Sequence, residues 1–319
     1  MASQVTVRKL ARHLVHQPPS AFTLRGLLGA KKGKLSLSAE KVRFSLMTQN
    51  MGLLTWPGVY LGTDRPGAVK ELVARINALS PDVVGLCEVF ADDEIAQIKV
   101  GILFTHPYRS YKLAESSVFS DGGCWVFSKH KILKENHHVF ANYVGDDKYA
   151  DKGVVHIRIQ PPGALRPLEI FYSHNQNIEE VGGKNALYAQ LVEMAGFIKK
   201  VADPNNPIFI MGDLNVPGEV PKHYEQMIIR LLGPVDFWLV SGGDPAKGFT
   251  FVADNNFYAN PAKNPKLNRR VDYILMRAPK TFVPMLKSID ILKFKLGGRD
   301  LSDHFGLHAQ FEQAAKVTF

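Results

Sequence analysis

The chain has 319 residues, of which 45% are hydrophobic, and a formal net charge of +9. This length and apolar fraction suit one large α/β domain or two smaller ones with a sizeable core. No apolar stretch is long enough to span a bilayer, and both cysteines lie in apolar segments, which argues against a membrane-spanning protein and a disulfide framework. The positive charge indicates an anionic partner such as nucleic acid, a phosphorylated substrate or an acidic membrane.

The first forty residues are basic and carry no acidic residue before Glu40. Lysines and arginines alternate there with leucines, without the continuous apolar stretch of a secretion signal. We expect residues 1–40 to be a basic N-terminal extension. By default it is a solvated tail, and the alternatives are an arm that contacts an anionic membrane surface and an organellar presequence. The expected location is cytoplasmic or peripherally membrane-associated.

The first elements are expected directly after this extension. Alternating residues at 42–47 predict a strand that leads to Asn50. The next loop, GLLTWPGVYLG, is so apolar that its side chains, Trp56 among them, either fold back into the core or form a rim that touches lipid or an apolar substrate. A helix is expected at residues 65–79. The following buried strand carries Glu88 near its carboxyl end, where a carboxylate needs a cation or strong hydrogen-bond donors.

The middle of the chain mixes strands, helices and one charged loop. We expect helices at residues 93–104 and 184–201, and strands at residues 122–128, 153–160 and 168–172. The charged loop ahead of the second strand contains Asp146, Asp147, Asp151 and Lys152, and by default it is a solvated connection. The third strand delivers the polar run SHNQN, which includes His174 and Asn177.

A short apolar strand at residues 208–211 leads into the sequence GDLNVPGE. In α/β proteins, polar residues at the carboxyl end of a buried strand lie where ligands bind. Asp213 and Asn215 are two residues apart, so on a strand they point the same way and can hold a metal, a water or a phosphate oxygen. A simple turn is the alternative, since Asp, Asn, Pro and Gly all favour turns.

The last third of the chain is mostly strands. We expect a helix at residues 221–232 and strands at residues 249–252, 271–276, 289–294 and 305–311. Asp272 lies in RRVDYIL, and Asp303 and His304 lie in LSDHFGL, again beside apolar runs. We expect residues 41–319 to form a single domain, a two-layered or four-layered α/β sandwich.

The polar groups at these strand ends are the types needed for metal-assisted phosphoester hydrolysis. Mg²⁺ prefers carboxylate and amide oxygens, keeps several waters and polarises a phosphoryl oxygen. A histidine can remove a proton from water, and a second acid can orient that histidine. Each residue also has a structural explanation by itself; His304, for example, could be a histidine satisfied by its neighbours.

Six motifs in order resemble the endonuclease/exonuclease/phosphatase superfamily: NxxxL after the first strand, LCEVF, SHNQN, GDLNVPGE, RRVDYIL and LSDHFG. The resemblance covers about residues 42–312 and implies a four-layered α/β/β/α sandwich of two mixed sheets flanked by helices. It also implies a metal site, with Mg²⁺, or Mn²⁺ or another divalent cation in its place, held by Glu88 with Asn50 and Asp303 close by. His304 would be the general base, oriented by Asp272 or positioned beside Asp303.

The same resemblance implies roles for the remaining candidates. Asp213 and Asn215 would align the attacking water and the phosphate, and His174 would stabilise or protonate the leaving side. The residues assigned to substrate binding are Trp56, Lys152 and Asn177.

Two further stretches, GFTFVADNNFYANP and DDKYADKGVVHI, are similar to segments of the neutral sphingomyelinase branch. In its animal members an Asp and a Lys five apart act as a conformational switch, and Asp147 with Lys152 has that spacing, although Asp146 and Asp151 are equally available. Ser173-His174-Asn175 departs from the usual Thr-His-Leu.

We therefore expect a Mg²⁺-dependent, sphingomyelinase-like phosphodiesterase with phospholipase C-type cleavage of sphingomyelin or a related phospholipid. The alternative is a Mg²⁺-dependent endonuclease or exonuclease acting on DNA or RNA, which the basic charge and the shared motifs favour. A non-catalytic binding protein that keeps the fold is a third possibility, and the intact set of acids and histidines argues against it.

Overall fold

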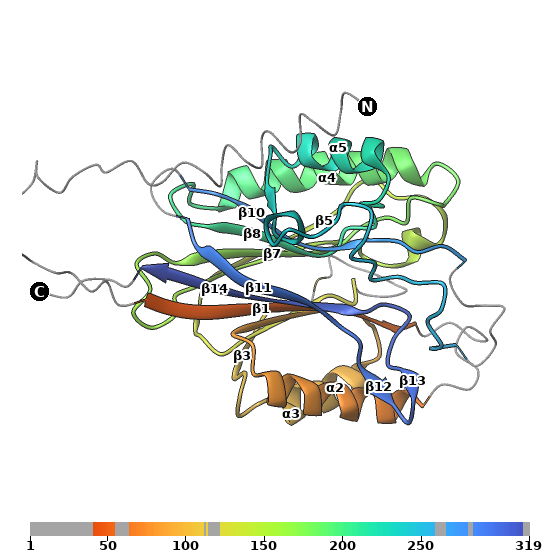
Figure 1. Cartoon of the computed structure of the whole chain (residues 1–319), viewed down its shortest axis with the longest axis horizontal. Helices are drawn as coiled ribbons and strands as arrows, with labels where there is room; N and C mark the ends of the chain where they lie inside the picture. The colour runs from red at the N-terminus through yellow and green to blue at the C-terminus, as the bar shows by residue number, and fades with distance from the viewer. Residues whose placement is uncertain are drawn as a thin grey trace, which may run out of the picture.

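The computed structural model describes residues 41–54, 64–111, 113, 122–258, 266–279 and 283–314. Two six-stranded mixed sheets lie between two pairs of helices, so the predicted four-layered α/β/β/α sandwich is confirmed (Figure 1). The basic extension and Trp56 lie outside the described residues. Among the helices of the described ranges, none combines the length and the apolar character that crossing a bilayer requires.

The first sheet has the strand order β11-β14-β1-β2-β4-β3. Its strands are β1 (Lys41–Leu53), β2 (Val83–Val89), β3 (Tyr108–Arg109), β4 (Trp125–Ser128), β11 (Met285–Leu292) and β14 (Gly306–Ala314). Only the β1 and β2 pair is parallel within this sheet. Helices α2 (Arg65–Leu79) and α3 (Asp92–Gly101) cover its outer face through a separate apolar cluster. The α2 helix begins where the Asp64 carboxylate accepts a hydrogen bond of 2.8 Å from the Gly67 amide.

The second sheet has the order β5-β6-β7-β8-β10-β9. Its strands are β5 (Ile132–Val139), β6 (Gly153–Ile159), β7 (Leu168–His174), β8 (Ile208–Asp213), β9 (Val235–Asp236) and β10 (Asp272–Arg277). The parallel pair here is β7 with β8. Helices α4 (Gly183–Val201) and α5 (Pro221–Arg230) cover this sheet, and a short helix α6 (Phe237–Val240) follows β9. A 3-10 turn, η2 (Gly145–Tyr149), precedes β6, and a small hairpin, β12 (Lys295–Leu296) with β13 (Arg299–Asp300), precedes β14.

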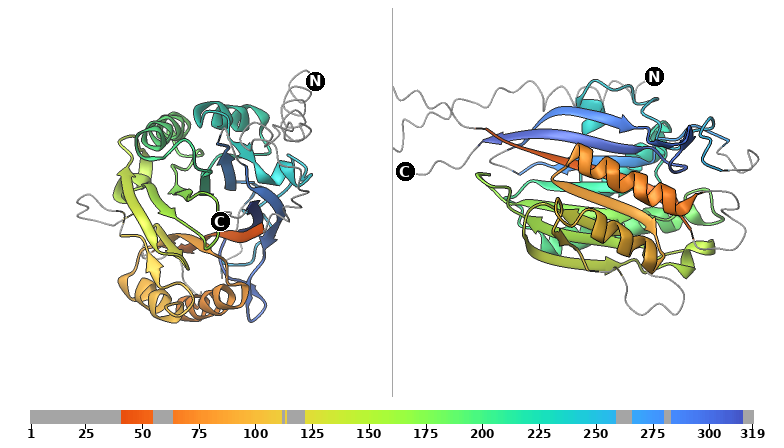
Figure 2. Two further views of the ribbon diagram at one scale, coloured as in Figure 1. Left: turned by 90° about the vertical axis from the view of Figure 1, so that its left-hand side faces the viewer. Right: turned by 90° about the horizontal axis from the view of Figure 1, so that it is seen from below.

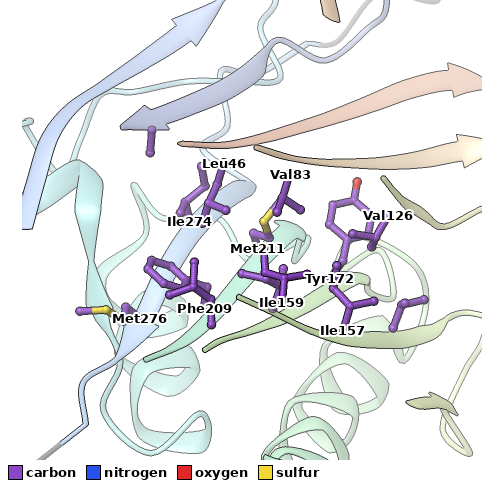
Figure 3. Packing of buried hydrophobic residues seen from close by; sticks show 14 of the residues in the cluster. Leu46, Val83, Val126, Ile157, Ile159, Tyr172, Phe209, Met211, Ile274 and Met276 are labelled. Carbon is purple, nitrogen blue, oxygen red and sulfur yellow. The ribbon is translucent and has the colours of Figure 1, made fainter. Parts of the chain in front are cut away.

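The main core fills the space between the two sheets (Figures 2 and 3). Leu46 and Val83 of the first sheet face Phe209 and Met211 of the second, and all four side chains are buried (Figure 3). The ring of Tyr172 lies against Gly85, where an added Cβ would come within 2.2 Å of it. The central strands of each sheet are apolar on both faces because helices cover one side of the sheet and the partner sheet covers the other.

One expected strand does not form, and one observed strand was not predicted. Residues 249–252 form no strand; Phe251 makes only isolated bridges to Arg269 and His304. The amides of Thr250 and Phe251 both donate to the Arg269 carbonyl, so a regular ladder cannot continue. Strand β5 was missed because its sequence, ILKENHHV, is polar and lacks strict alternation, as suits a half-exposed edge strand.

A buried ionic cluster lies at the start of β7. The Glu169 carboxylate accepts hydrogen bonds from His156 at 2.6 Å, Arg158 at 2.8 Å and Asn206 at 2.8 Å. Burial alone would raise the pKa of Glu169, but these donors outweigh it and lower the pKa from 4.5 to about 2. Because the folded pKa is depressed, this stabilisation is present above pH 4.5 and is lost as the pH falls toward 2.

Replacing Glu169 with alanine should therefore lower the free energy of unfolding at pH 7 by about 3–5 kcal/mol, since it leaves His156 and Arg158 without their buried partner. Urea unfolding measures the change. Glu71→Ala is the control, because Glu71 pairs with Arg75 on the exposed side of α2 and should lose at most about 1 kcal/mol. Equal losses for the two variants would contradict a stabilising role for the cluster.

Candidate active site

The candidate site lies where the carboxyl ends of the two parallel strand pairs meet. A cavity of about 680 Å³ opens there, between residues of both sheets. Eight predicted residues line it: Glu88, Lys152, His174, Asn177, Asp213, Asn215, Asp303 and His304. Asn50 and Asp272 lie directly behind these residues and bond to them. Asp272 begins the antiparallel strand β10 and pairs in register with Asp213, which ends β8, so both reach the same sheet edge.

One amide joins the two sheets at the base of the cavity. The Nδ2 atom of Asn50 donates to Glu88 Oε1 and to Asp213 Oδ2, each at 3.0 Å. The Oδ1 atom of Asn50 accepts a hydrogen bond of 2.9 Å from the Gly52 amide. Asn50 thus turns its nitrogen toward the carboxylates and aligns one acid from each sheet.

Backbone strain is concentrated at this edge. Glu88 has a φ of +55° and Asn215 a φ of +53°, a left-handed conformation that is uncommon for residues other than glycine. Gly52 has a φ of +59°, and an added Cβ there would lie 2.5 Å from Asp303 Oδ1. Strained residues that the surrounding fold holds in place are typical of functional sites.

Burial and a neighbouring carboxylate raise the pKa values of two acids at this edge, Glu88 and Asp213. Burial and the Asp303 carboxylate raise the pKa of Glu88 from 4.5 to about 7, although the Asn50 hydrogen bond lowers it. Burial and Asp272 likewise raise the pKa of Asp213 from 3.8 to about 6, against the influence of His304 and Asn50. Burial and repulsion between like charges disfavour the ionised form of these carboxylates, and a bound cation would relieve both.

The side chains at this edge fit a hard divalent cation. Ligand atoms of Glu88, His174 and Asp213 lie within 4.8 Å of one another, as do those of Asp213, Asp272 and His304. Mg²⁺ favours oxygen ligands, and each group offers two carboxylates; in the first, Glu88 and Asp213 come one from each sheet and both line the cavity. In the second group Asp272 is already bonded to His304.

His304 is held by Asp272. Its Nδ1 atom lies 2.9 Å from Asp272 Oδ2, and its Nε2 atom faces Asp213 Oδ2 at 3.9 Å. The Phe251 ring covers the imidazole with a centroid distance of 4.9 Å. Burial lowers the pKa of His304, but Asp272 and Asp213 outweigh burial and raise it well above its usual value. Asp303, the other expected partner, instead accepts a hydrogen bond of 2.6 Å from Tyr258.

Lys152 and His174 lie on the opposite side of the cavity floor. Lys152 Nζ is 3.2 Å from His174 Nε2 and pairs with Asp147 Oδ1 at 2.8 Å. His174 Nε2 also lies 3.5 Å from Glu88 Oε1 and 3.7 Å from Asp213 Oδ2. Burial, Lys152 and His304 lower the pKa of His174 well below its usual value, so this imidazole is neutral near pH 7.

The two remaining asparagines have local partners. Asn215 Nδ2 donates to the Asn175 carbonyl at 2.9 Å, and its amide donates to Asp213 Oδ1 at 2.9 Å. The predicted turn and the predicted site edge are thus the same feature. Asn177 lies at the rim, where its side-chain oxygen accepts a hydrogen bond of 2.9 Å from the Glu179 amide.

Sequence reasoning missed three residues that shape the site. Tyr258 and Phe251 lie in the stretch GFTFVADNNFY, which carried a resemblance but no signal that singled out either side chain. Gln190 is fully buried beneath the site on α4. Its signal was present: a polar residue on the otherwise apolar face formed by Leu187, Leu191 and Met194.

Comparison with known proteins agrees with this geometry. A sequence profile of the Endonuclease/Exonuclease/phosphatase family matches residues 47–304. Sphingomyelin phosphodiesterase 2 of Rattus norvegicus is 26% identical over 289 residues, which cover 84% of this chain and 65% of the rat protein. Sphingomyelinase C of Bacillus cereus is 32% identical over 190 residues, 54% of this chain and 56% of that protein.

A solved structure of a Staphylococcus aureus beta toxin variant with bound magnesium ions superposes with a TM-score of 0.65 at 20% identity, covering 86% of this chain and 100% of that one. The chain thus spans less than two thirds of the length of the rat and Bacillus relatives, while it shares the whole fold of the toxin. The family profile alone covers most of the chain, from β1 to His304. The chain belongs to the endonuclease/exonuclease/phosphatase family.

Proposed function

We propose that this protein is a Mg²⁺-dependent phosphodiesterase that cleaves sphingomyelin or a related phospholipid in the manner of a phospholipase C. The observation that carries the proposal is the Asn50-linked pair of carboxylates, Glu88 and Asp213, beside the His304–Asp272 pair. The curated relatives named as sphingomyelin-cleaving enzymes support the choice of substrate.

In the proposed mechanism, His304 acts as the general base. Its Nδ1–H donates to Asp272, which leaves Nε2 of the neutral ring to take a proton from water next to Asp213. The water oxygen then bonds to phosphorus as the bond from phosphorus to the lipid alcohol breaks. The departing oxygen keeps the electrons of that bond and takes a proton from solvent in the open cavity. Glu88 and Asp213 would hold the cation, which when bound supplies positive charge that polarises the phosphoryl oxygen and offsets the raised pKa of His304.

The opposite side of the cavity is assigned to the phosphate and the leaving oxygen. Lys152 carries the positive charge there, next to His174. Because the pKa of His174 is lowered, we assign it a stabilising role and not that of a proton donor. Asn215 and Asp213 align the phosphate and the water, and Asn177 contributes to substrate binding at the rim.

The charges that line the cavity are of both signs, which suits a zwitterionic head group. The acids Asp146, Asp147, Glu179 and Glu180 line it together with Lys266 and Arg269, and Arg269 pairs with Glu179 at 2.8 Å. Six of the nine net positive charges lie in residues 1–40, so the rest of the chain is only weakly basic.

A substrate panel tests the proposal. Purified protein is incubated with Mg²⁺ or with EDTA and given vesicles of sphingomyelin or phosphatidylcholine, single- and double-stranded DNA, or RNA. Release of phosphocholine with Mg²⁺ but not with EDTA is expected. Nucleic acid cleavage without lipid cleavage would establish the nuclease alternative, and no turnover on any substrate would favour a binding protein.

We also propose that residues 1–40 form an extension to a single catalytic domain, residues 41–319, and that this extension contacts anionic membranes. Replacing Lys31, Lys32 and Lys34 with glutamate should then weaken binding to phosphatidylserine vesicles by at least about 1 kcal/mol per lysine. Cosedimentation at 0.1 M salt measures the change. Glutamate at Lys199 and Lys200, in the last turn of α4, is the control, and an equal loss there would contradict the assignment.

A further inference from the structure

A chain of hydrogen bonds through the buried Gln190 side chain connects helix α4 to the floor of the candidate site. Gln190 Oε1 accepts from Asn175 Nδ2 at 3.3 Å and from the Gln176 amide at 2.8 Å. On its other side, Gln190 Nε2 donates to the Asn142 carbonyl at 2.7 Å. One side chain thus fastens two separate segments: the residues that follow β7, and the residues that lead from β5 into η2.

In the segment after β7, a single backbone carbonyl accepts hydrogen bonds from two site residues. The Asn175 oxygen accepts from Lys152 Nζ at 2.9 Å and from Asn215 Nδ2 at 2.9 Å. The Asn175 amide donates to the Asp213 carbonyl at 3.0 Å, and its side-chain oxygen accepts from Ser173 at 2.9 Å. The position of this carbonyl therefore sets the positions of two cavity-lining groups, the Lys152 ammonium and the Asn215 side-chain amide.

The segment before β6 carries the remaining partner of Lys152. Gln176 Oε1 accepts from the Val144 amide at 2.9 Å, and the Asn177 amide donates to Asp147 Oδ2 at 3.1 Å. The Asp147 carboxylate in turn pairs with Lys152. Gln190 therefore connects the two segments that hold the Lys152 ammonium: the one with the Asn175 carbonyl and the one with the Asp147 carboxylate.

Packing alone does not account for a glutamine at this position. Gln190 is fully buried on the apolar face of α4, where burying an amide is costly unless its hydrogen bonds are made. Both amide atoms of Gln190 are used, and each bond reaches a loop and not the helix or the sheet. An apolar side chain of the same length would fill the space but would leave the two loops unconnected.

We infer that Gln190 is a positioning residue, which acts through the Asn175 carbonyl to place Lys152 and Asn215 for phosphodiester cleavage. The inference rests on the proposed function for its catalytic consequence, and on geometry alone for the placement. Gln190 touches neither the cavity nor the reacting atoms, so it is not itself a catalytic residue.

Gln190→Met is the decisive variant, because methionine matches the length of glutamine and removes all three hydrogen bonds. We expect kcat of the folded protein to fall by about 10- to 100-fold, as for a misplacement of about 1 Å, with a much smaller change in KM. Gln97→Met, on the exposed face of α3, is the matched control and should keep the kcat of the wild type. An unchanged kcat in folded Gln190→Met protein would overturn the inference.

Removal of both target side chains separates positioning from general destabilisation. If Gln190 acts through Lys152 and Asn215, then Gln190→Met should have less than about a twofold effect on kcat in a background that carries both Lys152→Met and Asn215→Gly, because neighbouring residues in one network are not additive. The full 10- to 100-fold loss in that background would show that Gln190 acts on stability or through another route, and would overturn the inference.

Gln190→Glu serves if the methionine variant does not fold. A protonated glutamic acid can make the same three bonds, and ionisation removes its donor to Asn142, so kcat relative to the wild type should fall as the pH rises. A constant ratio across pH 6–9 would overturn the inference. If the wild type cleaves no substrate, the proposed function fails. A crystal structure of Gln190→Met, or of Gln190→Glu grown at pH 9, then decides the placement: Lys152 Nζ should have left the Asn175 carbonyl, and an unmoved lysine would refute it.

Discussion

Replacing His304 with alanine should lower kcat by about 100- to 10,000-fold, with a much smaller change in KM, because the base that takes the proton from water is lost. The structure supports this size of effect through two contacts. Asp272 binds Nδ1 at 2.9 Å and thereby fixes both the ring and the position of its proton, and Nε2 is directed at Asp213 across 3.9 Å. No rotation of the ring is needed before it can act.

The pH dependence of kcat provides an independent check. A general base must be deprotonated, and the carboxylates around His304 raise its pKa, so kcat should rise with pH. Asp272→Asn removes one of these charges, so it should move that rise to lower pH and also lower kcat, since the amide no longer holds the same tautomer. His137→Ala, on the exposed side of β5, is the control variant. A His304→Ala enzyme with the wild-type rate would remove this histidine from the mechanism.

Replacing Glu88 with glutamine should weaken Mg²⁺ binding by at least about 10- to 100-fold, because the cation loses a charged oxygen ligand while the shape of the site is kept. Titration calorimetry, or Mn²⁺ binding followed by electron paramagnetic resonance, measures this without any turnover. The pKa of Glu88 is about 7, so Mg²⁺ must displace a proton below that pH, and its affinity for the wild type should rise between pH 6 and pH 8.

In EDTA, where no cation is bound, Glu88→Gln should be more stable than the wild type, although it binds Mg²⁺ more weakly. The folded pKa of Glu88 lies above its ordinary value, so its ionised form is disfavoured in the folded state and costs stability above pH 7. Glu88→Gln should therefore unfold at a higher temperature than the wild type in EDTA at pH 8. Glu225→Gln, on the exposed face of α5, should change neither quantity. A variant that binds Mg²⁺ like the wild type would exclude Glu88 from the metal site.

Local sequence predicted the helices well because their signals are local. The bounds of α2 coincide with the predicted residues 65–79, where a capping aspartate, an early proline and one apolar face agree. Strand β5 was missed because its polar sequence lacks strict alternation. The strand expected at residues 249–252 does not form because Phe251 instead makes isolated bridges to Arg269 and His304, later in the chain. The structure gives the departure Ser173-His174-Asn175 a specific role, because Asn175 joins Ser173 to Gln190.

The sequence by itself determined the α/β class and the chemical types at the strand ends, because apolar runs and the residues that follow them are read from neighbouring positions. The choice of four layers over two came from the family resemblance. Tertiary structure alone decided the partnerships. Asp272, and not Asp303, holds His304; Asn50 links Glu88 to Asp213 across the two sheets; and Asp147 pairs with Lys152. These contacts join residues up to 163 positions apart, so their geometry depends on how the two sheets stack, which no local pattern encodes.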